Sequence, residues 1–197
     1  MRRNPLETWR ESFGNCVQQP EAAERLKAAS LNADLKSWTS ESTAAVVRSC
    51  EAIGWSAAAK GHPGRRLPKA GQEFLGVDVM AFPSEGDGGS RWPWPLAIFE
   101  LENSGSDDRV AYSLWKVLCV RAEMRVVFAY RPDWEQGRRL VASACDDVIG
   151  TLRPEQRLDI DGEVVMVIGS RGEGETFPWG YFKFWALNQR LGRFEKN

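Results

Sequence analysis

The segment from residue 96 to residue 130 constrains the fold more than any other part of the chain. Residues 96–102 (LAIFELE) and 125–130 (RVVFAY) are rich in the β-branched and aromatic residues that favour strands. The apolar residues between them recur at helical spacing: Val110, Leu114, Val117 and Leu118. Strands joined by a crossover helix lie parallel in one sheet, with a right-handed connection. The segment therefore predicts an α/β protein.

The remaining pattern extends this unit on both sides. Further helices are predicted at 6–17, 20–35, 40–53 and 133–149, and further strands at 55–59, 73–82, 164–168 and 181–187. The strand at 73–82 is apolar on both faces except for Asp78, which is typical of a strand inside a covered sheet. The turn-rich residues 83–90 predict a hairpin between it and the strand at 96–102.

These elements predict one domain with a mixed central β-sheet flanked by helices. We divide it into a helical segment (1–38), a core (39–150) and C-terminal strands (151–197). Hydrophobic residues make up 43% of the chain and charged residues 27%, as in ordinary globular proteins. No apolar stretch approaches the roughly 20 residues of a membrane span, and the N-terminus does not resemble a secretory signal. We expect a soluble, cytoplasmic protein without a membrane partner.

Cysteine and charge content exclude several kinds of function. The four cysteines are far apart and form no CxxC pair, and the chain has one histidine, so a zinc site is not expected. Free thiols in a reducing compartment are the expected state. The net charge of −1 gives no overall attraction to nucleic acid, so any such binding requires a local basic patch.

Three carboxylates mark a candidate metal site. Asp78 interrupts an apolar strand, and Glu100 and Glu102, two residues apart, share one face of the next strand. If the hairpin pairs about residues 83–95, Asp78 comes close to Glu100 and the three carboxylates converge. Burying an unpaired carboxylate costs several kcal/mol. A hard cation such as Mg²⁺ (or Mn²⁺) removes that cost, and it can lower the pKa of bound water.

The same residues resemble a known family. Residues 73–79 (EFLGVDV) and 97–103 (AIFELEN), in the order helix, strand, strand, strand, helix, strand, are similar to the PD-(D/E)xK nuclease core over roughly residues 40–130. The resemblance implies a restriction-endonuclease-like core that hydrolyses phosphodiester bonds in DNA with Mg²⁺, with Asp78 and Glu100 as metal ligands. Val77 stands at the proline position of the motif.

Other positions of the motif depart from the usual pattern. Glu102 stands where the family usually has lysine, so it is a third ligand or a water-orienting group. Lys116, on the following helix, is the candidate substitute for that lysine, if its flank of the helix faces the site. An additional acid is frequent on the family's first helix, and Glu51 is the better candidate for it than Glu41.

Basic residues supply candidate contacts to nucleic acid, and alternatives to an enzyme stay open. The candidate phosphate contacts are Arg65, Arg66, Lys69 and Arg109. Trp92 and Trp94 are expected in packing or an interface. The alternative function is a catalytically inactive module of the same fold that binds nucleic acid or a protein partner. The missing motif lysine and the near-neutral charge favour it. A homodimer formed through the aromatic-rich residues 177–194 is a third possibility.

Overall fold

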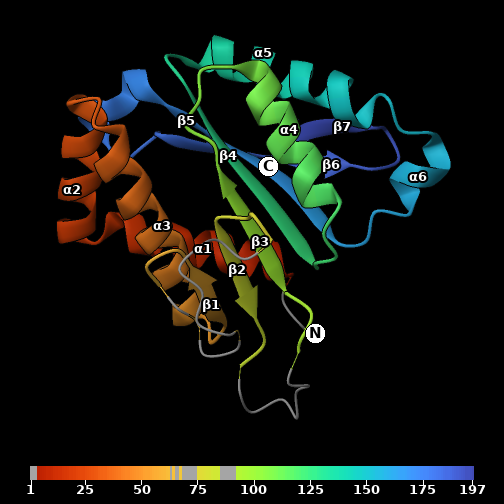
Figure 1. Ribbon diagram of the computed structural model, residues 1–197. Coiled ribbons are helices and arrows are strands. Elements are labelled where there is room, and N and C mark those ends of the chain that lie inside the picture. Colours follow the sequence, from red (N-terminus) through yellow and green to blue (C-terminus); the bar gives the residue numbers. More distant parts are fainter. Residues whose placement is uncertain (1–3, 63, 65–66, 68–74, 85–91) are drawn as a thin grey trace.

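The computed structural model describes residues 4–62, 64, 67, 75–84 and 92–197. Within these ranges, seven strands form one sheet whose spatial order follows the chain from β1 to β7 (Figure 1). They are β1 (Ser56–Ala59), β2 (Val79–Phe82), β3 (Ala97–Leu101), β4 (Met124–Arg131), β5 (Glu163–Ser170), β6 (Phe182–Asn188) and β7 (Arg193–Lys196). Strands β3, β4 and β5 are parallel, and the other neighbouring pairs are antiparallel. The predicted α/β fold with a mixed sheet flanked by helices is confirmed.

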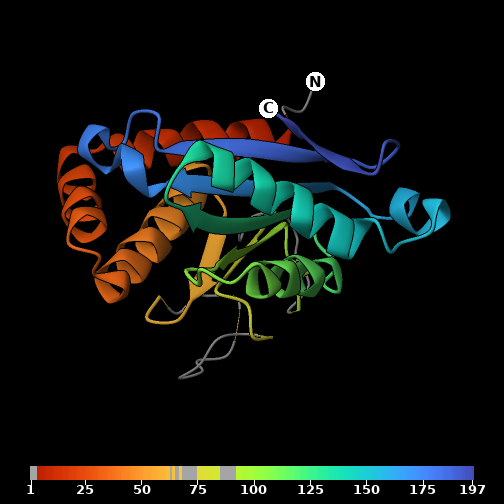
Figure 2. The same cartoon turned by 90° about the horizontal axis from the view of Figure 1, so that it is seen from above.

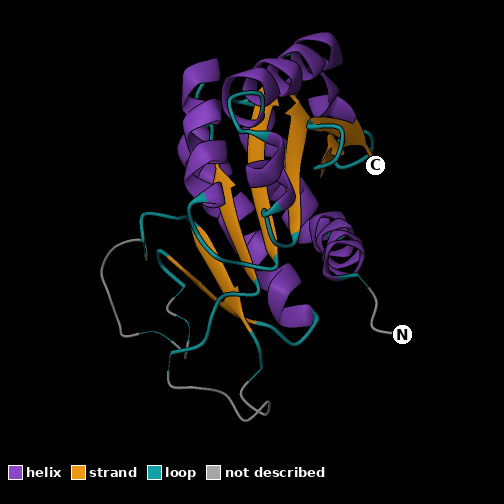
Figure 3. Cartoon of the chain, turned by 90° about the vertical axis from the view of Figure 1, so that its right-hand side faces the viewer, coloured by secondary structure: helices purple, strands orange, loops and turns teal. Residues whose placement is uncertain are grey.

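Helices cover both faces of the sheet, as Figures 2 and 3 show from two directions. One face carries α1 (Pro5–Gln18), α2 (Pro20–Leu31) and α3 (Leu35–Ala52). The other carries α4 (Asp107–Leu118) and α5 (Trp134–Ala144), which continues into a π-helical turn, Cys145–Ile149. Shorter helices are α6 (Pro154–Leu158) and a 3₁₀ segment, Arg171–Thr176. No helix in the described ranges is long and apolar enough to cross a membrane.

Alternation along the strands divides the interior into two cores. On the side of α1 to α3 the core is rich in aromatic rings, including Trp9, Phe99 and Phe128. On the side of α4 and α5 it is largely aliphatic, and Ile98 and Val127 lie there. Because successive strand residues point to opposite faces, strands such as β4, with all eight residues buried, need apolar side chains at nearly every position.

The starts of two predicted elements, α3 and β2, differ from those in the structure. Helix α3 begins at Leu35, five residues before the predicted start, because the Asp34 side chain caps it by accepting the Ser37 N–H at 3.1 Å. The predicted boundary at residue 38 therefore falls inside a helix. Strand β2 begins at Val79 and not at residue 73, because Leu75 and Gly76 adopt left-handed backbone angles (φ 53° and 67°) that form a turn.

Packing around the sheet explains Gly137 and the aromatic residues between 177 and 194. Gly137 lies in α5 and is buried; a Cβ there would lie 3.0 Å from the Ile168 Cγ2 atom, so the glycine permits close packing of α5 on β5. The aromatic residues between 177 and 194 were candidates for an interface. Phe177, Tyr181 and Phe184 instead pack in the aromatic core, and Trp179 is 66% exposed.

Gly162, in the turn before β5, is required for two independent reasons. Its φ is +76°, and a Cβ would overlap the carbonyl oxygen of Glu123. We expect Gly162→Ala to lower the free energy of unfolding by about 2 to 3 kcal/mol, from left-handed strain plus overpacking. Gly180 is the matched control, because its φ of +73° is similar but a Cβ there meets nothing within 4 Å. Equal losses for the two variants in urea denaturation would contradict the predicted role of the Glu123 carbonyl.

Candidate functional site

Asp78 and Glu100 lie opposite each other at the end of the β2–β3 pair. The register pairs Val79 with Phe99, so continuing it by one residue places Asp78 across from Glu100. The Asp78 Oδ2 atom accepts the N–H of Leu101 at 2.6 Å. Glu100 is only 4% exposed although it carries a carboxylate. This is the juxtaposition that the hairpin predicts.

Lys116, on α4, contacts Glu100 and the turn before β2. Its Nζ atom lies 2.7 Å from the Glu100 Oε2 atom and donates to the carbonyl of Gly76 at 2.7 Å. The side chains of Glu100 and Lys116 are 6% and 23% exposed, so this ion pair is largely buried. The lysine side chain therefore bridges β3 and the turn before β2. We call these residues the Asp78–Glu100–Lys116 group.

Arg125 fixes the end of α4 that carries Lys116. It is 4% exposed and its Nε atom donates to the carbonyls of Val117 at 3.1 Å and Val120 at 3.0 Å. Burial lowers the pKa of Arg125. A cation at the C-terminal end of a helix also interacts favourably with the helix dipole. The strand that follows α4 thus holds the helix by a charged group, which limits the positions open to the Lys116 ammonium.

Glu102 makes a local hydrogen bond at the end of β3. It follows β3 directly, and its carboxylate accepts the N–H of Ser104 at 2.7 Å, which stabilises the turn toward α4. In the part of the chain that the structure describes, no three His, Cys, Asp or Glu side chains are grouped so as to hold a metal ion. The predicted convergence of three carboxylates is therefore not found. Asp78 and Glu100 remain as candidate metal ligands. Mg²⁺ is commonly bound by one or two carboxylates plus water and phosphate.

The other predicted site residues that the structure describes lie apart from this group. Glu51 is exposed in the last turn of α3, which packs on the opposite face of the sheet from α4. Arg109 is exposed in the first turn of α4, two turns before Lys116. Ser113, between Arg109 and Lys116 on α4, is 2% exposed. The predicted loop contacts, Arg65, Arg66 and Lys69, lie outside the described residues.

Exposed aromatic rings border the group, and the sequence analysis did not identify this surface. Trp92 and Trp94 are 61% and 68% exposed, so of the two predicted roles, packing and an interface, they do not pack in the core. They line an apolar groove of about 440 Å³ with Arg121, whose guanidinium lies 5.2 Å from the Trp94 ring. On α4, Tyr112 and Trp115 are more than half exposed, with ring centres 5.9 Å apart. In the sequence, Tyr112 and Trp115 are three residues apart and lie outside the buried stripe of the helix. This pattern could have identified the exposed aromatic surface.

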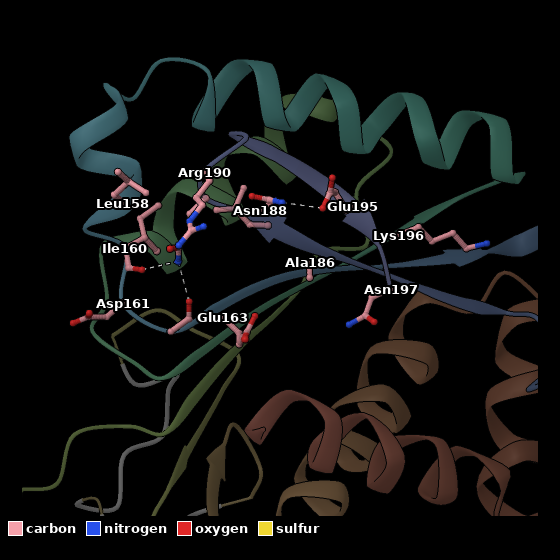
Figure 4. A pocket seen from close by; sticks show the side chains of 13 residues that line it. Leu158, Ile160, Asp161, Glu163, Ala186, Asn188, Arg190, Glu195, Lys196 and Asn197 are labelled. Carbon is pink, nitrogen blue, oxygen red and sulfur yellow. Dashed lines mark hydrogen bonds between the residues drawn. The ribbon is translucent and has the colours of Figure 1, made fainter. Parts of the chain in front are cut away.

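A larger cleft, of about 790 Å³, lies elsewhere (Figure 4). It is formed by α6, the start of β5 and the β6–β7 hairpin, and no predicted site residue lines it. Its polar side chains hold the chain together: Gln189 donates to the carbonyl of Ile160 at 2.7 Å, and Asn188 donates to Glu195 at 3.0 Å. These hydrogen bonds indicate that the polar residues of the cleft stabilise the fold.

The Asp78–Glu100–Lys116 group therefore combines two carboxylates with one ammonium at the end of neighbouring strands. This is the set of residue types that binds a divalent cation and stabilises a phosphoryl anion. Comparison of the chain with family models, with curated proteins and with solved structures gives no match in any of the three.

Proposed function

We propose that this protein is a divalent-metal-dependent nuclease that hydrolyses phosphodiester bonds in DNA, with the Asp78–Glu100–Lys116 group as its catalytic centre. The observation that carries the proposal is the 2.7 Å contact between Lys116 and Glu100, because it supplies from α4 the lysine that the sequence motif lacks. The element order that the family resemblance implies is present as α3, β1, β2, β3, α4 and β4.

Each residue of the group has a distinct role in this proposal. The carboxylates of Asp78 and Glu100 would hold Mg²⁺ or Mn²⁺, and the chemistry that such an ion would supply is a lower pKa of bound water. The Lys116 ammonium lies beside Glu100 in a largely buried position, where it stabilises negative charge that develops on the phosphoryl oxygens. Glu102 keeps the loop after β3 in place through Ser104. The four free cysteines fit a reducing compartment, and we place the protein in the cytoplasm.

A second candidate is a catalytically inactive module of the same fold that binds nucleic acid or a protein partner. The observation that favours it is that a protein group already contacts each of the two acids. Asp78 accepts the N–H of Leu101, and Glu100 is paired with Lys116. Such an arrangement is stable without a cation. The two candidates therefore differ in whether a divalent metal binds and in whether a polynucleotide is cut.

Thermal unfolding with and without Mg²⁺ or Mn²⁺ tests the metal site. A metal that binds only the folded protein, at ten times its Kd, adds about 1.4 kcal/mol, which raises the Tm by about 3 to 5 °C in a chain of this size. We expect this rise in the wild type and not in Asp78→Asn, which keeps the shape of the side chain. Asp146→Asn is the matched control, because Asp146 is exposed and lies in the turn after α5.

Cleavage of single- and double-stranded DNA by the same variants then separates the two candidates. The nuclease predicts metal-dependent cleavage by the wild type and Asp146→Asn, and none by Asp78→Asn. Absence of both the Tm rise and cleavage at millimolar metal would leave the inactive module as the better assignment. Equal cleavage by Asp78→Asn would show that the nuclease centre lies elsewhere.

A further inference from the structure

A cleft of about 660 Å³ at the carboxyl ends of the parallel strands has an arrangement that the proposed catalysis does not use. Its walls come from the ends of β4 and β5, the loop after β3, the chain after α2 and the first turns of α4 and α5. In α/β sheets this edge is the usual place for ligands. The charged residues among those that line it are Asp107, Arg131, Arg139 and Arg171.

Arg131 gives the cleft a rigid positive charge. It is the last residue of β4 and is 6% exposed. Its guanidinium contacts Asp107 at 2.5 Å and donates to the carbonyl of Tyr130 at 2.7 Å. A buried guanidinium held on several sides changes little in conformation when a ligand binds, so less ordering entropy is lost.

The other two arginines are placed to meet a ligand. Arg171 follows β5 directly, and its guanidinium lies 5.2 Å from the centre of the Tyr130 ring. A guanidinium that contacts an aromatic face retains N–H groups that can donate to a phosphate. Arg139, on α5, makes an i,i+4 pair with Glu135, and both side chains are largely exposed. Exposed pairs of this kind are weak and yield easily to a stronger anion.

The lining therefore holds three guanidinium groups and one carboxylate, an excess of two positive charges in a chain whose net charge is −1. The first turns of α4 and α5 lie at the same edge, where Asp133 already accepts the Gln136 N–H at 2.8 Å. Guanidinium groups match the geometry of phosphate oxygens, to which they bind in bidentate fashion. We propose that this cleft binds a phosphate group of a nucleic-acid strand. The assignment to nucleic acid rests on the proposed function.

The distance to the catalytic group fits one strand that contacts both places. Asn103 lines the cleft and Glu100 precedes it by three residues, so their Cα atoms are at most about 11 Å apart. A nucleic-acid strand in a duplex rises 3.4 Å per nucleotide. A phosphate held in the cleft therefore lies within a few nucleotides of Glu100 along one strand.

Binding measured in EDTA tests the cleft separately from hydrolysis. The probes are a fluorescent single-stranded oligonucleotide, followed by anisotropy, and inorganic pyrophosphate, followed by calorimetry. The test variant is Arg139→Ala/Arg171→Ala. The control variant is Arg138→Ala/Arg190→Ala, which removes two exposed arginines outside the cleft and makes the same change in net charge. Circular dichroism confirms that both variants are folded.

We expect the test variant to bind the oligonucleotide at least tenfold more weakly than the wild type, and the control variant to bind within twofold of it. Loss of this phosphate contact also reduces the slope of log K against log salt by about 0.7 for a single strand. Equal slopes and affinities for the two variants would overturn the proposal, as would no binding of either probe by the wild type. Binding of pyrophosphate alone would overturn the assignment to nucleic acid and leave a site for free phosphate. Loss of binding in the test variant supports the cleft even where no DNA is cut, so the two proposals fail separately.

Discussion

Replacing Trp9 with alanine is expected to lower the free energy of unfolding by about 3 to 5 kcal/mol, the usual cost of deleting a buried Trp or Phe. Trp9 is fully buried, and its ring lies 5.1 Å from that of Phe99 and 5.3 Å from that of Phe13. Its indole N–H also donates to the Ser49 hydroxyl at 2.9 Å. The residue thus joins α1 to both α3 and β3, and its removal leaves a cavity between three elements.

Trp179→Ala is the matched control, because it makes the same chemical change at a side chain that is 66% exposed. Its effect is expected within about 0.5 kcal/mol. Urea denaturation followed by circular dichroism measures both values. A loss below 1 kcal/mol for Trp9→Ala would show that α1 is an appendage and does not form part of the core. That outcome would support the predicted separation of residues 1–38.

Replacing Lys116 with methionine is expected to cost about 3 kcal/mol at neutral pH, although the aliphatic part of the side chain is kept. The variant leaves the Glu100 carboxylate buried with its ammonium partner removed, and breaking a buried pair from one side is strongly destabilising. Replacing both partners by neutral groups of similar shape should restore most of the stability. We therefore expect Glu100→Gln/Lys116→Met to be more stable than Lys116→Met alone.

The double-mutant cycle isolates the coupling between the two charges. Lys36→Met serves as the control, since Lys36 is exposed on α3, and it should change stability by less than about 0.5 kcal/mol. Additive effects of Glu100→Gln and Lys116→Met would contradict the predicted coupling. Under the proposed function, the double variant is also inactive in DNA cleavage despite its recovered stability, and this separates the catalytic contribution from the structural one.

Local patterns predicted most of the elements of this fold. The strands at 96–102 and 125–130 lie within one residue of β3 and β4, because periodic apolar residues report burial directly. The start of α3 was missed because Asp34 is a stronger N-cap than the pattern around Ser40 suggested. The turn at Leu75 and Gly76 was missed for another reason. It lies in a run of apolar and extended-looking sequence, and its left-handed backbone is decided by the chain around it.

Prediction of the candidate site was less complete. The pairing of Asp78 with Glu100 followed from hairpin geometry, because an antiparallel register fixes which residues face each other. Lys116 was only a conditional candidate, because the rotation of α4 over the sheet depends on contacts such as that of Arg125 with Val117. The arginine cleft was not predicted at all. Arg131, Arg139 and Arg171 belong to three elements, and only the parallel order of the strands brings them to one edge.

The strand order has a consequence for how the protein is made. Since the order in the sheet follows the chain, each newly synthesised strand can add to an edge that already exists. Helix α1 differs from the strands, because its partner is made much later. Its Arg10 and Trp9 contact Phe184 of β6, which is far from them in the sequence. The apolar face of α1 therefore stays incompletely covered during synthesis until β6 has also been made. Exposed apolar surface of this kind promotes aggregation.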